Sequence, residues 1–255
     1  MTRRHRLVRI YGRIGRVYWA WAPRLLALAV IVFIPLGFVD ALLEQVDTSG
    51  LDVTDGFKVA ALLGALAAVT ASSLFGEVFF SGAIAASLTH PADEESPGFV
   101  QLARHISYGK LIAVDLLFVL MSVVGFALFI VPGILVFIYL SLAGPVVELE
   151  KISVSGGFKR SFRLVRGHFW MVAAILIPVE IVGDGVNEAL VGAAHHLLGH
   201  TLLAAWVGES VGNIVTAPVV SVAIVLLTLD LIRHRDGSAP KLKRRPEALG
   251  ASGPA

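Results

Sequence analysis

Three acidic residues lie within a long apolar stretch of the sequence, where an ionisable side chain could serve chemistry. Glu180 stands about eleven residues into the stretch, and Asp184 and Glu188 follow at intervals of four. If the stretch is helical, this spacing puts the three carboxylates on one face, together with His195. Charge inside hydrocarbon is costly and is usually retained for function, so the stripe could line a path for a cation or a proton. The structural alternative is a protonated or hydrogen-bonded Glu180, with Asp184 reaching the water outside.

A second group of carboxylates stands near the ends of apolar stretches, on the side where arginines gather. The group consists of Glu77, Asp115, Glu148, Glu150 and Asp230. Their position favours a structural role, in which each carboxylate pairs with an arginine of a neighbouring polar segment. We expect Glu150 to pair with Arg160 or Arg163, and Asp230 to take part in a further structural ion pair.

Three histidines near the end of the same apolar stretch raise the question of a metal site. His196 and His200 are one helical turn apart, a workable spacing for two ligands, but His195 points elsewhere on a helix and no second pair supports a site. The sequence also lacks cysteine, a glycine-rich phosphate loop and paired catalytic carboxylates. We therefore expect no metal, no cofactor and no enzymatic activity.

The elements that must position these residues are transmembrane helices. Of the 255 residues, 56% are hydrophobic and only 16% are charged, whereas a soluble domain carries about 25% charged residues. About 20 apolar residues are needed to cross the hydrocarbon core as a helix. Six segments qualify: 25–43, 58–84, 111–131, 133–149, 170–194 and 206–232. Only Pro132-Gly133, a strong turn signal, separates the third from the fourth, so we expect a tight hairpin there.

The distribution of lysine and arginine predicts which side of the membrane each loop faces. Twenty of the 21 basic residues fall in the N-terminal segment, the second and fourth connections and the C-terminal tail, and only Lys58 falls on the opposite side. Because basic loops are retained in the cytoplasm, both termini are expected there, with the protein in the cell membrane. An odd number of spans would not sort the charges in this way.

Three polar segments on the cytosolic side are amphipathic if they are helical. They comprise 1–24, the stretch from Ser96 to Ile106, and the stripe Phe158, Phe162, Val165 and Phe169 with Lys159, Arg163 and Arg166 beside it. Helices of this kind lie in the headgroup plane and turn their basic side chains toward anionic lipid. The sequence thus predicts an all-α membrane bundle: an interfacial helix at 1–24, six transmembrane helices within 25–232, and a disordered basic tail at 233–255.

The most distinctive motifs stand between 132 and 170. They are Pro132-Gly133, Pro145, Glu150, and the run Arg160-Ser161-Phe162-Arg163-Leu164-Val165-Arg166-Gly167-His168-Phe169-Trp170. This pattern resembles the bacterial membrane proteins grouped with the membrane domain of glycerophosphoryl diester phosphodiesterase, and Asp230 to Gly237 resembles that family's closing motif. The resemblance implies a bundle of six helices. It implies no activity, because the catalysis of phosphodiesterase members belongs to a separate soluble barrel that this chain lacks.

Three classes of function remain open from the sequence. The first is a non-catalytic membrane protein that acts through anionic lipid headgroups, a membrane protein partner or a second copy of itself at the cytosolic leaflet. The second is a small transporter or channel that uses Glu180, Asp184 and the acidic face of the fifth span. The third, a membrane-embedded enzyme, has the least support. Nucleic acid is not an expected partner, because the basic segments flank the spans and follow the topology rule.

Overall fold

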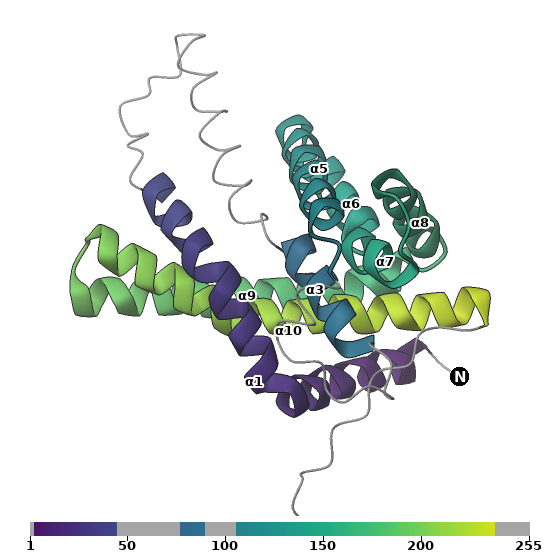
Figure 1. The fold of residues 1–255 in the computed structure, drawn as a ribbon, viewed down its shortest axis with the longest axis horizontal. Helices are drawn as coiled ribbons and strands as arrows, with labels where there is room; N and C mark the ends of the chain where they lie inside the picture. The colour runs from purple at the N-terminus through teal and green to yellow at the C-terminus, as the bar shows by residue number, and fades with distance from the viewer. Residues whose placement is uncertain (1–2, 45–76, 90–105, 238–255) are drawn as a thin grey trace, which may run out of the picture.

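The structure, a computed structural model, describes residues 3–44, 77–89 and 106–237. Its helices are α1 (Arg3–Glu44), α3 (Glu77–Thr89), α5 (Tyr108–Leu128), α6 (Ile130–Leu140), α7 (Ala143–Glu150), α8 (Val154–Arg166), α9 (Phe169–Leu198) and α10 (Leu202–Asp236) (Figure 1). No strand occurs within these three ranges. The predicted all-α fold class is therefore confirmed for the described part of the chain.

Five helical segments are long and apolar enough to cross a membrane. They are Ile10–Val39, Tyr108–Leu128, Ile130–Glu150, Phe169–Leu198 and Leu202–Asp236. They overlap the predicted spans one, three, four, five and six. The predicted second span at 58–84 lies outside the described residues except for 77–84, which belong to α3. Five such helices indicate a multi-pass membrane protein, and the sixth span stays a prediction.

Helix α10 forms the centre of the molecule. Every residue from Val220 to Leu229 is buried, as expected for a helix that is apolar on all sides. Helices α1 and α9 pack along α10, and α3 packs against both α10 and α7. In Figure 1, α9 and α10 lie along the long axis of the molecule and are joined at one end, while α5 and α6 project away from them.

Two glycines one helical turn apart let α10 approach α9 closely. A Cβ atom on Gly208 would lie only 2.8 Å from the Cα atom of Val191, and a Cβ atom on Gly212 would overlap the side chain of Asn187. In a membrane the apolar side chains of helices gain little by leaving lipid, so small residues that allow such close packing stabilise the helix pair.

The close approach at Gly208 predicts that the same substitution has different effects at two glycines of the α9–α10 hairpin. We expect Gly208→Ala to destabilise the protein by about 1–3 kcal/mol, because the added methyl group must displace the α9 backbone. In contrast, a Cβ atom on Gly192 of α9 meets nothing within 4 Å, so Gly192→Ala should be neutral or slightly stabilising. Thermal unfolding in detergent measures both variants, and equal effects would contradict this account of the packing.

Helix α1 is continuous across residue 24, where the sequence predicted a boundary between an interfacial helix and the first span. Pro23 lies inside the helix, and Figure 1 shows that α1 changes direction along its length. A proline inside a helix removes one hydrogen bond and clashes with the preceding turn, which accounts for a bend without a break. The second predicted amphipathic stretch lies outside the described residues apart from Ile106. Residues 233–236, predicted as part of a disordered tail, belong to α10, and 238–255 lie outside the described residues.

The N-terminal part of α1 is held by a hydrogen bond to a carbonyl group that a proline leaves unused. The Tyr11 hydroxyl donates to the carbonyl oxygen of Ala174 at 2.8 Å. In a regular helix that oxygen would accept from the residue four positions later, but Pro178 has no N–H. Because a carbonyl without a partner is costly inside a membrane, this contact favours packing of α1 against α9.

The hairpin between the third and fourth spans turns at Phe129, so the turn predicted at Pro132-Gly133 is wrong. Phe129 is extended, with φ −169° and ψ 157°, and stands between the end of α5 and the start of α6. Pro132 lies in the first turn of α6, where its missing N–H removes no bond within the helix. Gly133 serves packing instead, since its Cα atom lies 3.0 Å from where a Cβ atom on Gly125 would stand.

The fourth span is a broken helix. Helix α6 ends at Leu140 and α7 begins at Ala143, with Ser141 and Leu142 in a turn between them. Pro145 favours the break, because it has no N–H to offer to the carbonyl of Ser141. At the start of α7, Gly144 lies directly against the carbonyl of Val78 in α3. The break sets the direction of α7, whose last turn carries Glu148 and Glu150.

Candidate functional site

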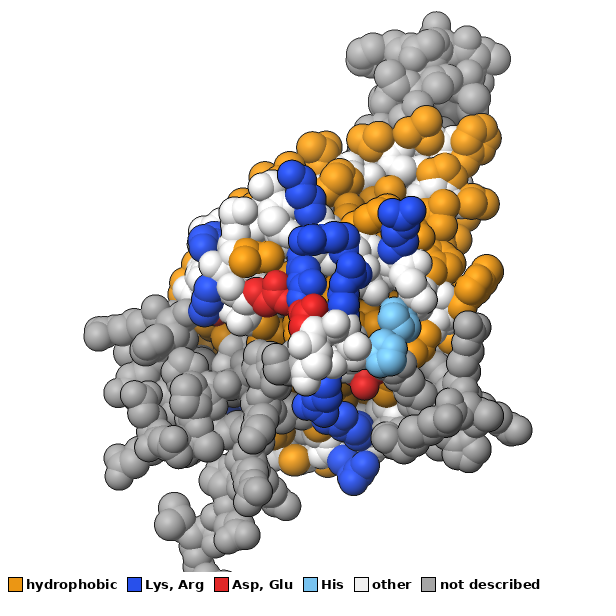
Figure 2. Space-filling view, turned by 90° about the vertical axis from the view of Figure 1, so that its right-hand side faces the viewer, with side chains coloured by type: hydrophobic (Ala, Val, Ile, Leu, Met, Phe, Trp, Pro, Cys, Tyr) orange, Lys and Arg blue, Asp and Glu red, His pale blue; other side chains and the backbone are white. Residues whose placement is uncertain are grey.

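The candidate functional site lies where α7, α8 and the end of α10 meet. Figure 2 shows lysine and arginine side chains gathered around carboxylates on this face, which is the right-hand side of Figure 1. Helix α7 ends at Glu150, and the next residue, Lys151, has a φ of 51° that turns the chain out of the helix. Helix α8 then begins at Val154, and the preceding Ser153 caps it with its hydroxyl oxygen, which accepts the N–H of Gly156 at 3.2 Å. This side-chain cap satisfies one of the N–H groups that a helix start leaves unbonded.

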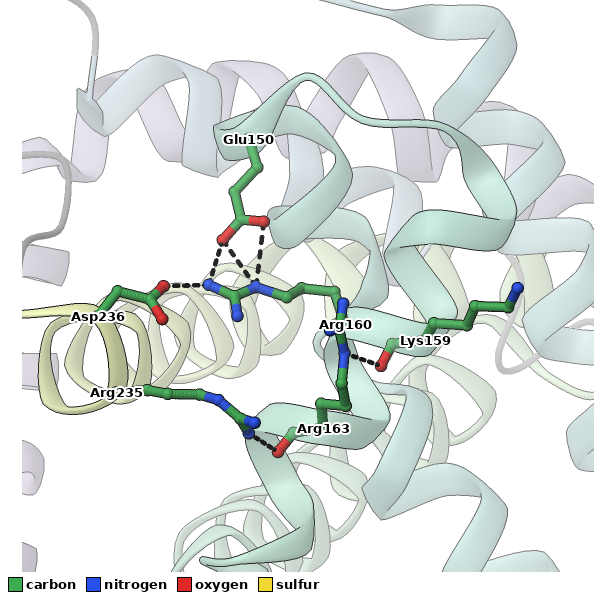
Figure 3. A network of polar contacts seen from close by, with 6 residues as sticks. All are labelled: Glu150, Lys159, Arg160, Arg163, Arg235 and Asp236. Carbon is green, nitrogen blue, oxygen red and sulfur yellow. Dashed lines mark hydrogen bonds and ion pairs between the residues drawn. The ribbon is translucent and has the colours of Figure 1, made fainter.

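Arg160 joins the three elements in one charged network (Figure 3). Its Nε donates to both carboxylate oxygens of Glu150, at 3.0 and 3.1 Å, and its Nη2 donates to Glu150 Oε1 at 2.9 Å. The same Nη2 also pairs with Asp236 of α10. Only 14% of the Arg160 side chain is exposed, against 25% for Glu150 and 38% for Asp236. The network therefore holds α8 to both α7 and α10 in a partly desolvated setting.

Electrostatics keep Arg160 charged in this position. Burial lowers its pKa, but the hydrogen bonds and negative charges of Glu150 and Asp236 outweigh burial, so the pKa lies above its ordinary value. A planar guanidinium with a fork of N–H groups suits two carboxylates better than an ammonium would. Arg160 is thus committed to internal contacts and is unavailable to an external anion.

The other predicted members of the ion-pair set are Arg163 on α8 and Asp230 on α10. Arg163 Nε donates to the main-chain oxygen of Lys159 at 3.3 Å, and the main-chain oxygen of Arg163 accepts from Arg235. Asp230 is half-buried on α10, about one and a half turns before Asp236. The predicted ion pair of Asp230 stays a prediction, and the carboxylate of α10 that binds Arg160 is Asp236. One signal pointed to Asp236: a negative charge at a helix C-terminus is unfavourable unless a cation offsets it.

Glu148 and Asp115 have structural partners of different kinds. Glu148 is buried, forms an ion pair with Lys151, and accepts the N–H of Ser107 at 3.3 Å. It therefore links the end of α7 to the start of α5. Asp115 is 1% exposed and accepts the N–H of Val78 at 3.0 Å, so it binds the first turn of α3. The side chain of Glu77 lies outside the described part of the structure.

Helix α8 is two-sided. Its buried side consists of Gly157, Ser161, Leu164 and Val165. The Ser161 hydroxyl donates at 2.7 Å to the carbonyl of Tyr139, which lies beside the break between α6 and α7. The ring of Tyr139 stacks on Phe162, with 4.7 Å between ring centres. The predicted aromatic stripe is thus split, because Phe169 belongs to α9 and not to α8.

The outward side of α8 carries an open groove. It is lined by two phenylalanines one helical turn apart, Phe158 and Phe162, and by two cations with the same spacing, Lys159 and Arg163. Among the described residues, neither of the two basic side chains forms an ion pair with a carboxylate. The groove therefore combines apolar rings with two positive charges that no carboxylate of the described ranges neutralises.

The acidic residues of α9 lie far from this face. Glu180 is half-buried, whereas Asp184 and Glu188 are exposed, so the three carboxylates differ in burial. Near them, Asn187 Nδ2 donates to Glu209 Oε2 of α10 at 3.2 Å. The structure thus sets Asp184 at an exposed position on α9, and the proposed path for a cation or a proton stays a prediction.

The histidines at the far end of α9 are arranged differently from the prediction. Because α9 ends at Leu198 and Gly199 has a φ of 75°, His200 does not continue the helical face of His196. His200 instead stacks on the ring of His195, with centres 4.9 Å apart. Within the described ranges, no group of three or more His, Cys, Asp or Glu residues could hold a metal ion.

The fold and this face define a class: an all-helical, multi-pass membrane protein with a charged end built from α7, α8 and α10. The chain matches no model of a protein family, and no curated protein or solved structure is found to be similar to it. The resemblance to the phosphodiesterase membrane domain therefore stays a prediction, and the site has to be interpreted from its own chemistry.

Proposed function

We propose that this protein is a non-catalytic protein of the cell membrane that binds anionic lipid headgroups at the cytosolic leaflet. In this proposal both termini are cytoplasmic and the segment 58–84 completes six spans. The sorting of basic residues along the sequence supports this orientation. The arrangement in Figure 1 supports it as well, since the start of α1, α8 and the C-terminal end of α10 lie toward the same side.

The proposal rests on one observation: neighbouring cations on α8 differ in whether they have a carboxylate partner. Arg160 is neutralised by Glu150 and Asp236, whereas Lys159 and Arg163 have no carboxylate partner among the described residues. Internal ion pairs that stabilise α8 account for Arg160, but they do not account for the two cations that point away from Glu150 and Asp236. Cations near the cytosolic leaflet attract anionic lipid by about 1 kcal/mol each, so the outward pair suits a negatively charged surface.

The proposal predicts selective stabilisation by anionic lipid. The full-length protein in a neutral detergent should gain several degrees in melting temperature when phosphatidylglycerol is added, because a ligand that binds only the folded state stabilises it. An equal amount of phosphatidylcholine should give a clearly smaller gain, and added salt should reduce the difference by screening the charges. Equal stabilisation by both lipids at low salt would overturn the proposed function.

A further inference from the structure

We infer that the groove on α8 is the binding site for a single anionic phospholipid, with Lys159 and Arg163 on the phosphate and the two phenylalanines beside the lipid chains. This inference rests on the proposed function and assigns it to four side chains: Phe158, Lys159, Phe162 and Arg163. The groove is open to the outside of the molecule, and each of these residues lies on α8.

The spacing of the two cations fits one phosphate group. Lys159 and Arg163 are four residues apart on a helix, so their side chains emerge from the same face about one turn apart. Arg163 uses Nε for the carbonyl of Lys159 at 3.3 Å, which leaves its two terminal nitrogens for an external acceptor. In Figure 3 the Lys159 side chain extends away from Glu150 and Asp236. Charge-assisted hydrogen bonds from an ammonium and a guanidinium to phosphate are among the strongest polar contacts.

The aromatic wall distinguishes a lipid from a free phosphate. Phe158 packs inward against the cluster around Val147, while Phe162 stacks on Tyr139 and remains 42% exposed. Trp170 follows at the start of α9 and is 76% exposed. Exposed aromatic rings beside basic groups are typical of the boundary between headgroups and acyl chains. A free phosphate would leave this apolar surface uncovered, and a phospholipid would cover it.

The surrounding contacts make the groove rigid before any lipid binds. Ser153 caps the first turn of α8, Arg160 fastens its middle, and Arg235 donates to the Arg163 carbonyl near its end. A carbonyl in the last turn of a helix lacks a partner within the helix, so Arg235 supplies one. A site held in its binding conformation loses less entropy when the ligand arrives.

The test is a titration of the full-length protein in neutral detergent with phosphatidylglycerol, followed by native mass spectrometry. The double variant Lys159→Gln/Arg163→Gln should bind roughly tenfold more weakly or worse, since it loses two direct cation contacts. The matched control is Lys110→Gln/Arg233→Gln, which removes the same charge from two exposed positions outside the groove. Its affinity should fall by less than about threefold, through weaker long-range attraction alone.

Two further arms separate the outcomes. If the wild type prefers phosphatidylglycerol to phosphatidylcholine but both double variants lose affinity equally, the groove assignment is wrong while the proposed function survives. If the wild type shows no preference for phosphatidylglycerol over phosphatidylcholine, both the groove assignment and the proposed function are wrong. Phe162→Ala should weaken the binding of phosphatidylglycerol and leave the binding of inorganic phosphate unchanged. An equal loss of affinity for both ligands would exclude a lipid as the occupant of the groove. Arg163→Lys should retain most of the affinity, which separates loss of charge from loss of folding.

Discussion

Arg160→Ala is expected to lower the melting temperature of the detergent-solubilised protein by roughly 5–10 °C. The substitution leaves Glu150 and Asp236 without their shared cation, and Glu150 is three-quarters buried. Exposed ion pairs contribute about 0–1 kcal/mol, whereas removal of one partner from a buried pair costs about 3–5 kcal/mol. The partial exposure of this network puts the expected loss between those values, at about 2–3 kcal/mol.

Arg233→Ala is the matched control for this prediction. Arg233 stands in the last turn of α10, is exposed, and forms no ion pair among the described residues. Its replacement should shift the melting temperature by no more than about 2 °C. A double substitution of Arg160 and Glu150 should cost clearly less than the sum of the two single ones, because the two side chains share one interaction. Additive losses, or equal losses for Arg160→Ala and Arg233→Ala, would show that the network does not hold α8 in place.

Gly144→Ala is expected to destabilise the protein by about 3 kcal/mol, at the upper end of the range for overpacked sites. A Cβ atom at this position would overlap the carbonyl oxygen of Val78 and lie 3.1 Å from its carbonyl carbon. Both atoms belong to the backbone of α3, so no side-chain rotation can relieve the contact. Helix α7 must move away from α3, and its last turn carries the two acidic residues that bind Lys151 and Arg160.

The control is the same substitution at an open position. A Cβ atom on Gly109, in the first turn of α5, meets nothing within 4 Å, so Gly109→Ala should be neutral or slightly stabilising. Thermal unfolding and hydrogen exchange of α3 and α7 measure the difference between the two variants. Unchanged protection of α3 in Gly144→Ala would show that the close approach to Val78 is dispensable.

The ion pair between Glu150 and Arg160 could be predicted from the sequence because both residues lie near one short connection. Helix α7 ends at Glu150 and α8 begins at Val154, so few conformations keep the two side chains apart. Asp236 was missed because its proximity to Arg160 spans 76 residues of sequence. No local pattern reports such a contact, which depends on how α10 passes α8.

Turns were predicted less well than spans, for a related reason. Pro132-Gly133 is a strong turn signal, yet Pro132 is equally suited to the first turn of a helix, and the close packing of Gly125 on Gly133 decided between the two. In the same way His196 and His200 share a face only if the helix continues. It ends at Leu198 instead, and His200 stacks on His195.

By itself the sequence determined the composition-driven features: an all-helical chain, the five apolar helices seen in the structure, and the basic character of the segments around α8. These features follow from how many consecutive apolar residues the chain contains and where its charges fall. Only the tertiary structure decided which cations pair with carboxylates of the protein and which face outward. That division depends on how α10, which is distant in sequence, packs against α7 and α8, so residues as similar as Arg160 and Arg163 acquire different roles.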